Sequence, residues 1–165
     1  LLMQQAGITP AIRPVVDQAN RLEEETGEPA MAIQLPDGRM VTGKTSDTLG
    51  AASALLLNAL KAVGGIGDQF ELISAQVLEP VCRLKTQYLG HKNPRLHTDE
   101  VLMALTISAL TNPLAELAQQ QLPKLRGCDA HFTVILSEVD ENLLRRLGIN
   151  VSCEARYETK KLYHK

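Results

Sequence analysis

The sequence predicts an α/β fold with a mixed, partly parallel sheet of about five strands and helices packed on its faces. Strand-like and helix-like segments alternate along the chain, which is the pattern of a sheet covered by helices. A chain of 165 residues is long enough to bury one core, and 44% hydrophobic with 22% charged residues is typical of globular domains. We therefore assign residues 1–155 to a single α/β domain and residues 156–165 to a basic C-terminal arm.

The N-terminal third predicts a helix followed by a β-hairpin. The helix begins near Pro10 or near Pro14 and ends near Thr26, because proline suits the first turn of a helix and a Gly-Glu-Pro sequence follows its end. Apolar residues alternate over residues 30–35 and return over residues 40–42. The Pro-Asp-Gly sequence between these two runs is typical of a tight turn.

The middle of the chain predicts mostly helices. Their ends are marked by glycines and their starts by Ser, Thr or Asn, the residues that cap free backbone amides. The expected elements are a helix over residues 46–63, a short buried strand over 70–73, a helix that Ser74 caps and that extends to about residue 89, and a helical pair over 98–126 whose members begin at Thr98 and at Asn112.

The last third predicts a strand, a helix and a second strand. Residues 130–136 form a continuous apolar run, and Ser137 with Asp140 three residues later resembles a capping box at the start of a helix. That helix ends at Gly148. Residues 149–155 alternate apolar and polar side chains, which is the pattern of a half-exposed strand, either an outer strand or one with a single covered face.

Composition argues against several classes of protein. The net charge of −2, an aromatic content of 3% and the lack of Trp make nucleic-acid binding an unexpected function. No apolar run reaches the roughly 20 residues that cross a bilayer, so no membrane segment is expected. The three cysteines Cys82, Cys128 and Cys153 are widely spaced and indicate a cytoplasmic protein. The first residues, Leu-Leu-Met-Gln-Gln, lack both an initiator Met and a signal peptide, so we expect the chain to start inside a longer protein.

Residues 38–45 match the spacing of a phosphate-binding P-loop, Gly-x-x-x-x-Gly-Lys-Thr. A P-loop follows directly on a strand, whereas Gly38 here ends a turn and a strand is expected after it, so the sequence does not favour this interpretation. A narrower hypothesis places Lys44, Thr45 and Ser46 at a helix N-terminus, where free amides and a lysine bind an anion. The alternative is ordinary capping of that helix by Thr45 or Ser46.

The loop over residues 91–97 is the segment richest in groups that bind anions or carry protons. Its candidate ligand-binding residues are Lys92, Asn93, Arg95 and His97. The alternative is a solvated connection whose shape Pro94 fixes.

Cys128 and His131 have a Cys-x-x-His spacing. A structural zinc needs four ligands, and no second close Cys/His pair follows, so no metal site is predicted. A buried, hydrogen-bonded histidine is the interpretation that the apolar strand around His131 favours. Spacing alone supports no Cys-His nucleophile either.

Several long motifs resemble those of a bacterial family called domain of unknown function 1846, in its C-terminal region. The resemblance spans essentially the whole chain and depends on residues 35–38, 42–46, 90–100, 125–128, 134–140 and 157–165, with Lys-Asn-Pro-Arg-Leu-His-Thr-Asp-Glu at 92–100 the most specific. It implies a considerably longer protein whose N-terminal part carries a more convincing P-loop-like segment. It also implies that position 91 varies among members, which makes His91 the weakest candidate in the loop. It implies no particular activity.

Two hypotheses on function follow. In the first, Lys44, Thr45, Lys92, Arg95 and His97 converge on an anionic, phosphorylated small molecule or nucleotide at an interface with the N-terminal domain of the same protein. In the second, the chain is an interaction domain whose helices, together with the arm over residues 156–165, form a homo-oligomer, and it has no ligand site of its own. The sequence identifies neither catalytic residues nor a cofactor, and leaves open whether the protein is an enzyme.

Overall fold

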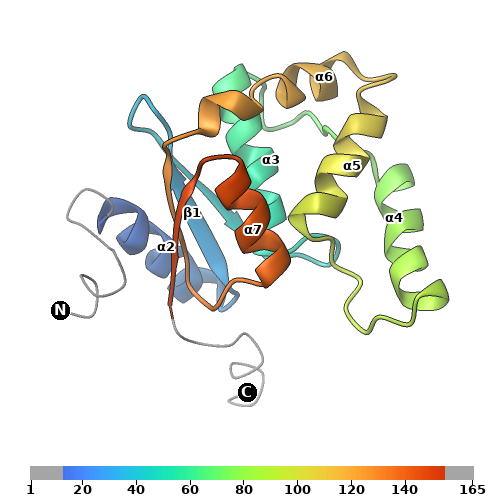
Figure 1. The fold of residues 1–165 in the computed structure, drawn as a ribbon, viewed down its shortest axis with the longest axis horizontal. Helices are drawn as coiled ribbons and strands as arrows, with labels where there is room; N and C mark the ends of the chain where they lie inside the picture. The colour runs from blue at the N-terminus through green and yellow to red at the C-terminus, as the bar shows by residue number, and fades with distance from the viewer. Residues whose placement is uncertain (1–12, 155–165) are drawn as a thin grey trace.

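A computed structural model describes residues 13–154, and these residues form one mixed sheet surrounded by helices (Figure 1). The strands are β1 (Ala30–Gln34), β2 (Met40–Lys44), β3 (Asp129–Phe132) and β4 (Asn150–Cys153), in the spatial order β2-β1-β3-β4. β1 is antiparallel to both of its neighbours, while β3 and β4 are parallel. The carboxyl ends of β2, β3 and β4 therefore lie at the same edge of the sheet.

The mixed α/β architecture is confirmed, but the described sheet has four strands rather than about five. The prediction of a strand over residues 70–73 is wrong. These residues pair with no other strand; Leu72 and Ile73 are buried in the core, whereas Phe70 is 45% exposed. The short apolar run is explained by the burial of Leu72 and Ile73 in the main core, which apolar residues outside a sheet can enter as well as a strand can.

Helices cover both faces of the sheet (Figure 1). On one face lies α2 (Arg13–Thr26), whose Val15 and Ala19 pack against Ala32 of β1. On the other lie α3 (Ala51–Gly64) and α7 (Glu138–Arg146), and they share the main core with the opposite side chains of β1 and β3. The predicted end of the first helix at Thr26 and the predicted hairpin β1-β2 are confirmed.

The start of α3 differs from the prediction. A helix from Ser46 was expected, but β2 continues to Lys44 and the helix begins only at Ala51, with Gly50 as its N-cap. Residues 46–49 form a turn, in which the Ser46 backbone N–H donates to the carbonyl of Leu49. Leu49 also bridges to Leu96, a contact across 47 residues of chain that no local pattern reveals.

The outer helices lie beyond α3 (Figure 1). They are α4 (Ala75–Arg83), which runs into a π-helical turn (Leu84–Tyr88), then α5 (Thr98–Ser108), α6 (Pro113–Gln119) and a 3₁₀ turn (Leu122–Leu125). The predicted cap at Asn112 is confirmed, since its side chain accepts from the Leu114 amide. At α5 the prediction is off by one residue, because His97 is the N-cap and Thr98 is already helical.

β3 is shorter than the strand predicted over residues 130–136. It ends at Phe132 because its partner β1 begins at Ala30, so the chain beyond Thr133 has no strand left to pair with. The following residues instead pack into the core and lead to α7. Its predicted cap is confirmed, as the Ser137 hydroxyl accepts from the Asp140 amide at 3.2 Å.

β4 lies at the edge of the sheet, one of the two positions that the alternating pattern allowed, with Asn150 exposed and its other three residues half-buried. Within residues 13–154, no helix is both long and apolar enough to cross a membrane. The predicted arm over 156–165 and the alternative helix start near Pro10 lie outside the described residues.

Candidate functional site

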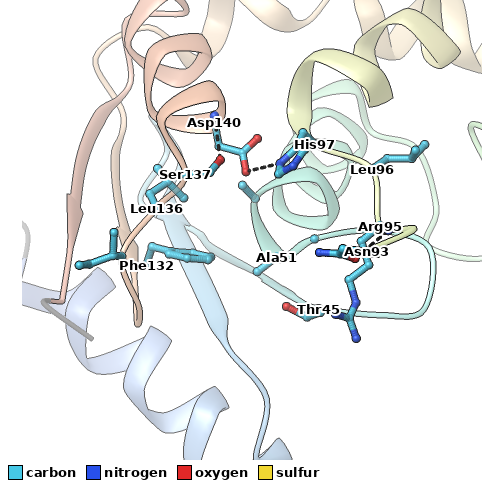
Figure 2. Close-up of a pocket in the computed structure, with 13 residues that line it drawn as sticks. Thr45, Ala51, Asn93, Arg95, Leu96, His97, Phe132, Leu136, Ser137 and Asp140 are labelled. Atoms are coloured by element: carbon cyan, nitrogen blue, oxygen red, sulfur yellow. Dashed lines mark hydrogen bonds and ion pairs between the residues drawn. The ribbon is translucent and has the colours of Figure 1, made fainter. Parts of the chain in front are cut away.

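A pocket of about 350 Å³ lies at the sheet edge where the carboxyl ends of β2, β3 and β4 meet (Figure 2). In open α/β sheets this is the edge at which ligands bind. The pocket is lined by residues that follow β2, begin α3, precede α5, and connect β3 to α7: Thr45, Gly50, Ala51, Ala52, Asn93, Arg95, Leu96, His97, Phe132, Ile135, Leu136, Ser137 and Asp140.

Three helices begin at this pocket. Gly50, His97 and Ser137, the N-caps of α3, α5 and α7, are all among its lining residues. The first backbone amides of a helix have no partner inside the helix, and the helix dipole adds a partial positive charge there. At α3 no side chain caps these amides, and both Ala51 and Ala52 line the pocket. The N-terminus of α3 therefore presents uncapped donors to the pocket.

At α5 the corresponding position is filled by a carboxylate from another helix. Asp140 is the third residue of α7, and its Oδ1 accepts from the Thr98 backbone N–H at 2.8 Å and from the Thr98 hydroxyl at 2.7 Å. Its Oδ2 lies 3.4 Å from Nδ1 of His97. Figure 2 shows Asp140 and His97 facing each other across the top of the pocket.

The pKa values of His97 and Asp140 move apart. The hydrogen bond that the His97 ring donates to Asp140 raises the pKa of His97 above its ordinary value of 6.5, although partial burial opposes protonation. Burial opposes ionisation of Asp140, but hydrogen bonds from His97 and Thr98 outweigh it and keep the Asp140 pKa below 3.8. The pair is thus an ionised aspartate beside a histidine that takes up a proton more readily than usual.

The loop that carries Arg95 and His97 is fastened to the start of α3. Leu96 donates its backbone N–H to Thr48, while its carbonyl accepts from the Gly50 amide and, at 2.8 Å, from the Ser53 hydroxyl. Arg95 Nε donates to the carbonyl of Ser46 at 2.6 Å. Two segments almost fifty residues apart are therefore held side by side.

A buried lysine connects the same loop to the first turn of α5. Lys85 lies in the π-helical turn with only 6% of its side chain exposed. Its Nζ donates to the carbonyl of Arg95 and to Oε1 of Glu100, at 2.9 Å for the latter. The same oxygen of Glu100 accepts from the His97 backbone N–H at 2.8 Å.

Thr45 offers its hydroxyl to the pocket. The residue is only 8% exposed, yet its hydroxyl has no hydrogen-bond partner within residues 13–154. In Figure 2 its oxygen turns toward the pocket. Because this hydroxyl faces the pocket, it can donate a hydrogen bond to an anion that binds there.

The opposite wall is apolar. Phe132 ends β3, and Ile135 and Leu136 lie in the connection to α7. Phe132 and Leu136 belong to the main core, while Ile135 is 37% exposed at the pocket. The pocket therefore has one side rich in hydrogen-bond donors and one side that excludes water.

The structure brings four of the seven predicted ligand-binding residues to the pocket, namely Thr45, Asn93, Arg95 and His97. The other three, Lys44, Ser46 and Lys92, are exposed and do not line it. The expectation that Lys44 to Ser46 begin a helix is wrong, because they end β2 and start a turn.

The P-loop spacing is explained by the hairpin. Residues 38–45 run from the hairpin turn through β2, and they do not form a loop around a phosphate. The second glycine of the spacing has a packing role: a Cβ on Gly43 would lie 2.4 Å from the backbone nitrogen of Leu55 in α3. Gly38, with φ of +91°, serves the turn.

Sequence reasoning missed the part of the pocket that follows β3. Ser137 and Asp140 were recognised as a capping pair, but not as functional candidates. The available signal was their position, since a helix start directly after a buried strand is where α/β proteins place ligands. Nothing local signals that the Asp140 side chain leaves its own helix to bind Thr98.

Cys128 and His131 do not form a reactive pair. His131 is a buried histidine, as predicted: Nδ1 lies 2.8 Å from the Ser152 hydroxyl and Nε2 lies 3.2 Å from a carboxylate oxygen of Glu154. Burial, and then the charge of Asp129, raises the pKa of the Cys128 thiol and disfavours the thiolate. The described residues contain no group of three His, Cys, Asp or Glu side chains arranged to hold a metal ion.

Comparison with known proteins agrees with the resemblance carried by the motifs. A family model described as "Domain of unknown function DUF1846, C-terminal" matches residues 11–163. The UPF0371 proteins of Corynebacterium efficiens, Corynebacterium glutamicum and Streptococcus pyogenes are 52%, 51% and 46% identical to the chain over 165 residues. Each match covers 100% of this chain and 33% of the relative, so the chain spans a third of the length of these relatives.

Proposed function

The chain belongs to the DUF1846 family, as its C-terminal domain, and we propose that this domain binds the anionic group of a phosphorylated small molecule or nucleotide in the pocket beyond β3. The observation that carries the proposal is the convergence of Thr45, Arg95 and His97 with the uncapped N-terminus of α3 at one pocket.

The anionic group would bind to the amides of Ala51 and Ala52 and to the Thr45 hydroxyl. A helix N-terminus favours an anion through its free N–H groups and through a partial charge of roughly +0.5. Arg95 adds a permanent positive charge on the same side of the pocket (Figure 2). The Thr45 hydroxyl adds a hydrogen-bond donor at the same place, and a phosphate oxygen is an acceptor that it can bind.

The remainder of the ligand would lie against Phe132, Ile135 and Leu136. A volume of about 350 Å³ is at the small end of ligand sites in proteins and suits a compact phosphorylated metabolite. The apolar wall favours a ligand with one face that avoids water, such as a sugar or a nucleobase.

The rest of the full-length protein would complete the site. Relatives are about three times as long as this chain, and Ile135 is partly exposed at the pocket. We propose that the preceding domain covers this side, where ligand sites between domains commonly form. A cytoplasmic location belongs to the same proposal, since Cys82, Cys128 and Cys153 all carry free thiols.

Thermal unfolding of the 165-residue chain against inorganic phosphate, AMP and a sugar phosphate tests the proposal. Because Trp is absent, circular dichroism is the suitable signal. A ligand at about one hundred times its dissociation constant adds about 2.7 kcal/mol, which raises the midpoint by roughly 5–10 °C.

Variants show whether such a shift originates in the pocket. It should be lost in Arg95→Gln and reduced in Thr45→Val. It should persist in Lys92→Gln and Thr48→Val, which change neighbours outside the lining. Equal loss in Lys92→Gln, or no shift with any of the three ligands, would contradict a phosphate site in this pocket.

A second candidate function is homo-oligomerisation, and one surface feature favours it. Met103, Ile107 and Leu110 recur at helical spacing along the outer side of α5 and just beyond it, with 67%, 61% and 83% of their surface exposed. Sedimentation of the chain and of Ile107→Glu decides: association that this substitution abolishes supports the function, and a monomer at all concentrations contradicts it.

A further inference from the structure

We propose that His97 is the proton-exchanging residue of the pocket: oriented by Asp140, it binds the ligand's anionic group as an imidazolium and holds a transferable proton beside it. This rests on the proposed function, because it concerns the same pocket. The inference adds an acid–base residue to the pocket. It also makes anion binding depend on pH, which binding to the N-terminus of α3 and to Arg95 alone does not require.

The geometry fixes which ring nitrogen faces the ligand. An ionised carboxylate is only an acceptor, so the 3.4 Å contact between Nδ1 of His97 and Asp140 is a hydrogen bond when Nδ1 is protonated, as it is in the imidazolium form. Asp140 is itself held by two hydrogen bonds from Thr98, and only 12% of its side chain is exposed. The Nε2 atom of His97 has no partner in the described part of the chain, and 41% of this side chain is exposed.

His97 also has the right chemistry among the lining residues. The other ionisable side chains of the pocket are Arg95 and Asp140. Arginine stays charged at all accessible pH values, and Asp140 ionises well below neutrality. An imidazole whose carboxylate partner orients it is the arrangement by which proteins move protons near neutral pH.

The charges around His97 come from three further elements. Asp140 faces it from α7 and favours protonation, as does Glu100 from the first turn of α5. Lys85 from the π-helical turn opposes protonation of His97, although its Nζ is hydrogen-bonded to Glu100. Arg95 precedes it in the loop. An anion that binds at α3 adds a negative charge to this set and so strengthens the imidazolium form.

Sulfate is the probe of choice, since it remains a dianion across the range in which histidine titrates. Its affinity for the 165-residue chain would be measured by calorimetry at about pH 5.5 and about pH 8.5. We expect binding at least about tenfold weaker at the higher pH, the effect of losing one charged hydrogen bond. In His97→Gln the affinity should be low and equal at both pH values.

Two further variants test whether the pH dependence of sulfate binding originates at His97 and whether Asp140 raises the pKa of this residue. His91→Gln removes an exposed histidine outside the pocket and should keep the full pH dependence. With sulfate affinity measured at further pH values between the two already given, Asp140→Asn should lower the pH at which the affinity falls, because it removes the charge that favours protonation of His97. NMR titration of the four histidines, with His97 identified by its loss in His97→Gln, should show the same decrease in pKa without any ligand.

The outcomes are distinguishable. Saturable sulfate binding with equal affinity at both pH values, or a pH dependence that survives His97→Gln, overturns this inference and leaves the proposed function standing. An unchanged His97 pKa in Asp140→Asn overturns the orienting role of Asp140. The lack of saturable binding at either pH overturns both proposals.

Discussion

The carboxylate of Asp140 accepts both the backbone N–H and the hydroxyl of Thr98, at 2.8 and 2.7 Å, and so joins the N-terminus of α7 to that of α5. Thr98 is completely buried. Two helices that begin 40 residues apart in sequence thus meet through one side chain. The arrangement makes the stability of the fold and the shape of the pocket depend on the same residue.

Replacement of Asp140 by Ala should destabilise the chain by about 1–3 kcal/mol, since it leaves a buried amide and a buried hydroxyl without an acceptor. Urea unfolding followed by circular dichroism measures the change. Glu138→Gln is the matched control, because it removes a carboxylate from the same helical turn at an exposed position. Equal losses of unfolding free energy in the two variants would show that Asp140 stabilises the chain through the helix dipole and not through its hydrogen bonds to Thr98.

The stability of the chain should depend on pH through the His97–Asp140 pair. The pKa of Asp140 is lowered in the folded state, so its contribution is present above about 3.8 and is lost as pH falls through the folded value. The pKa of His97 is raised, so its contribution is complete below 6.5 and is lost as pH rises through the folded value. Both contributions are present between these limits.

Urea unfolding across the pH range checks this expectation. The free energy of unfolding should be highest between about pH 4 and 6.5 and decline on both sides. In His97→Gln the decline on the alkaline side should become shallower, while the acid side should remain because Thr98 still binds Asp140. An unchanged alkaline decline would assign it to other groups.

Lys85→Met should lower stability by about 1–3 kcal/mol and weaken anion binding together. Methionine keeps the apolar stem but removes the donor to Arg95 and the partner of Glu100, which leaves a half-buried carboxylate without its lysine. Urea unfolding and sulfate titration measure the two effects. In the double variant with Glu100→Gln the losses should be less than additive, because both substitutions break the same pair. Full additivity would contradict this coupling.

Gly43→Ala should be strongly destabilising, by at least about 2 kcal/mol, even though alanine fits a strand better than glycine does. The added Cβ would lie 2.4 and 2.6 Å from the backbone N and Cα of Leu55, so β2 and α3 would have to separate. Gly50→Ala is the control: its Cβ would meet nothing closer than the Leu96 carbonyl oxygen at 3.7 Å. Thermal unfolding compares the two, and similar midpoints would refute the close packing at Gly43.

The sequence by itself determined the local elements of this protein. The turn at Gly38, the caps at Asn112 and Ser137 and the stop after Thr26 depend on residues within a few positions of one another, so local physical chemistry predicts them. It also showed that residues 91–97 are rich in polar chemistry. The family could be recognised for the same reason, because its motifs are continuous stretches of sequence.

Only the tertiary structure decided which of these residues form a site. Arg95 is placed by the Ser46 carbonyl and His97 by the Asp140 carboxylate, partners 49 and 43 residues away. Lys92, in the same loop, was an equal candidate by composition but does not line the pocket. Strand boundaries depended on the same long-range information. The strand β3 ends where its partner β1 begins. Residues 70–73 pair with no strand, and Leu72 and Ile73 pack in the main core instead. A hydrogen bond between distant segments depends on how the whole chain packs, and local propensity does not contain that information.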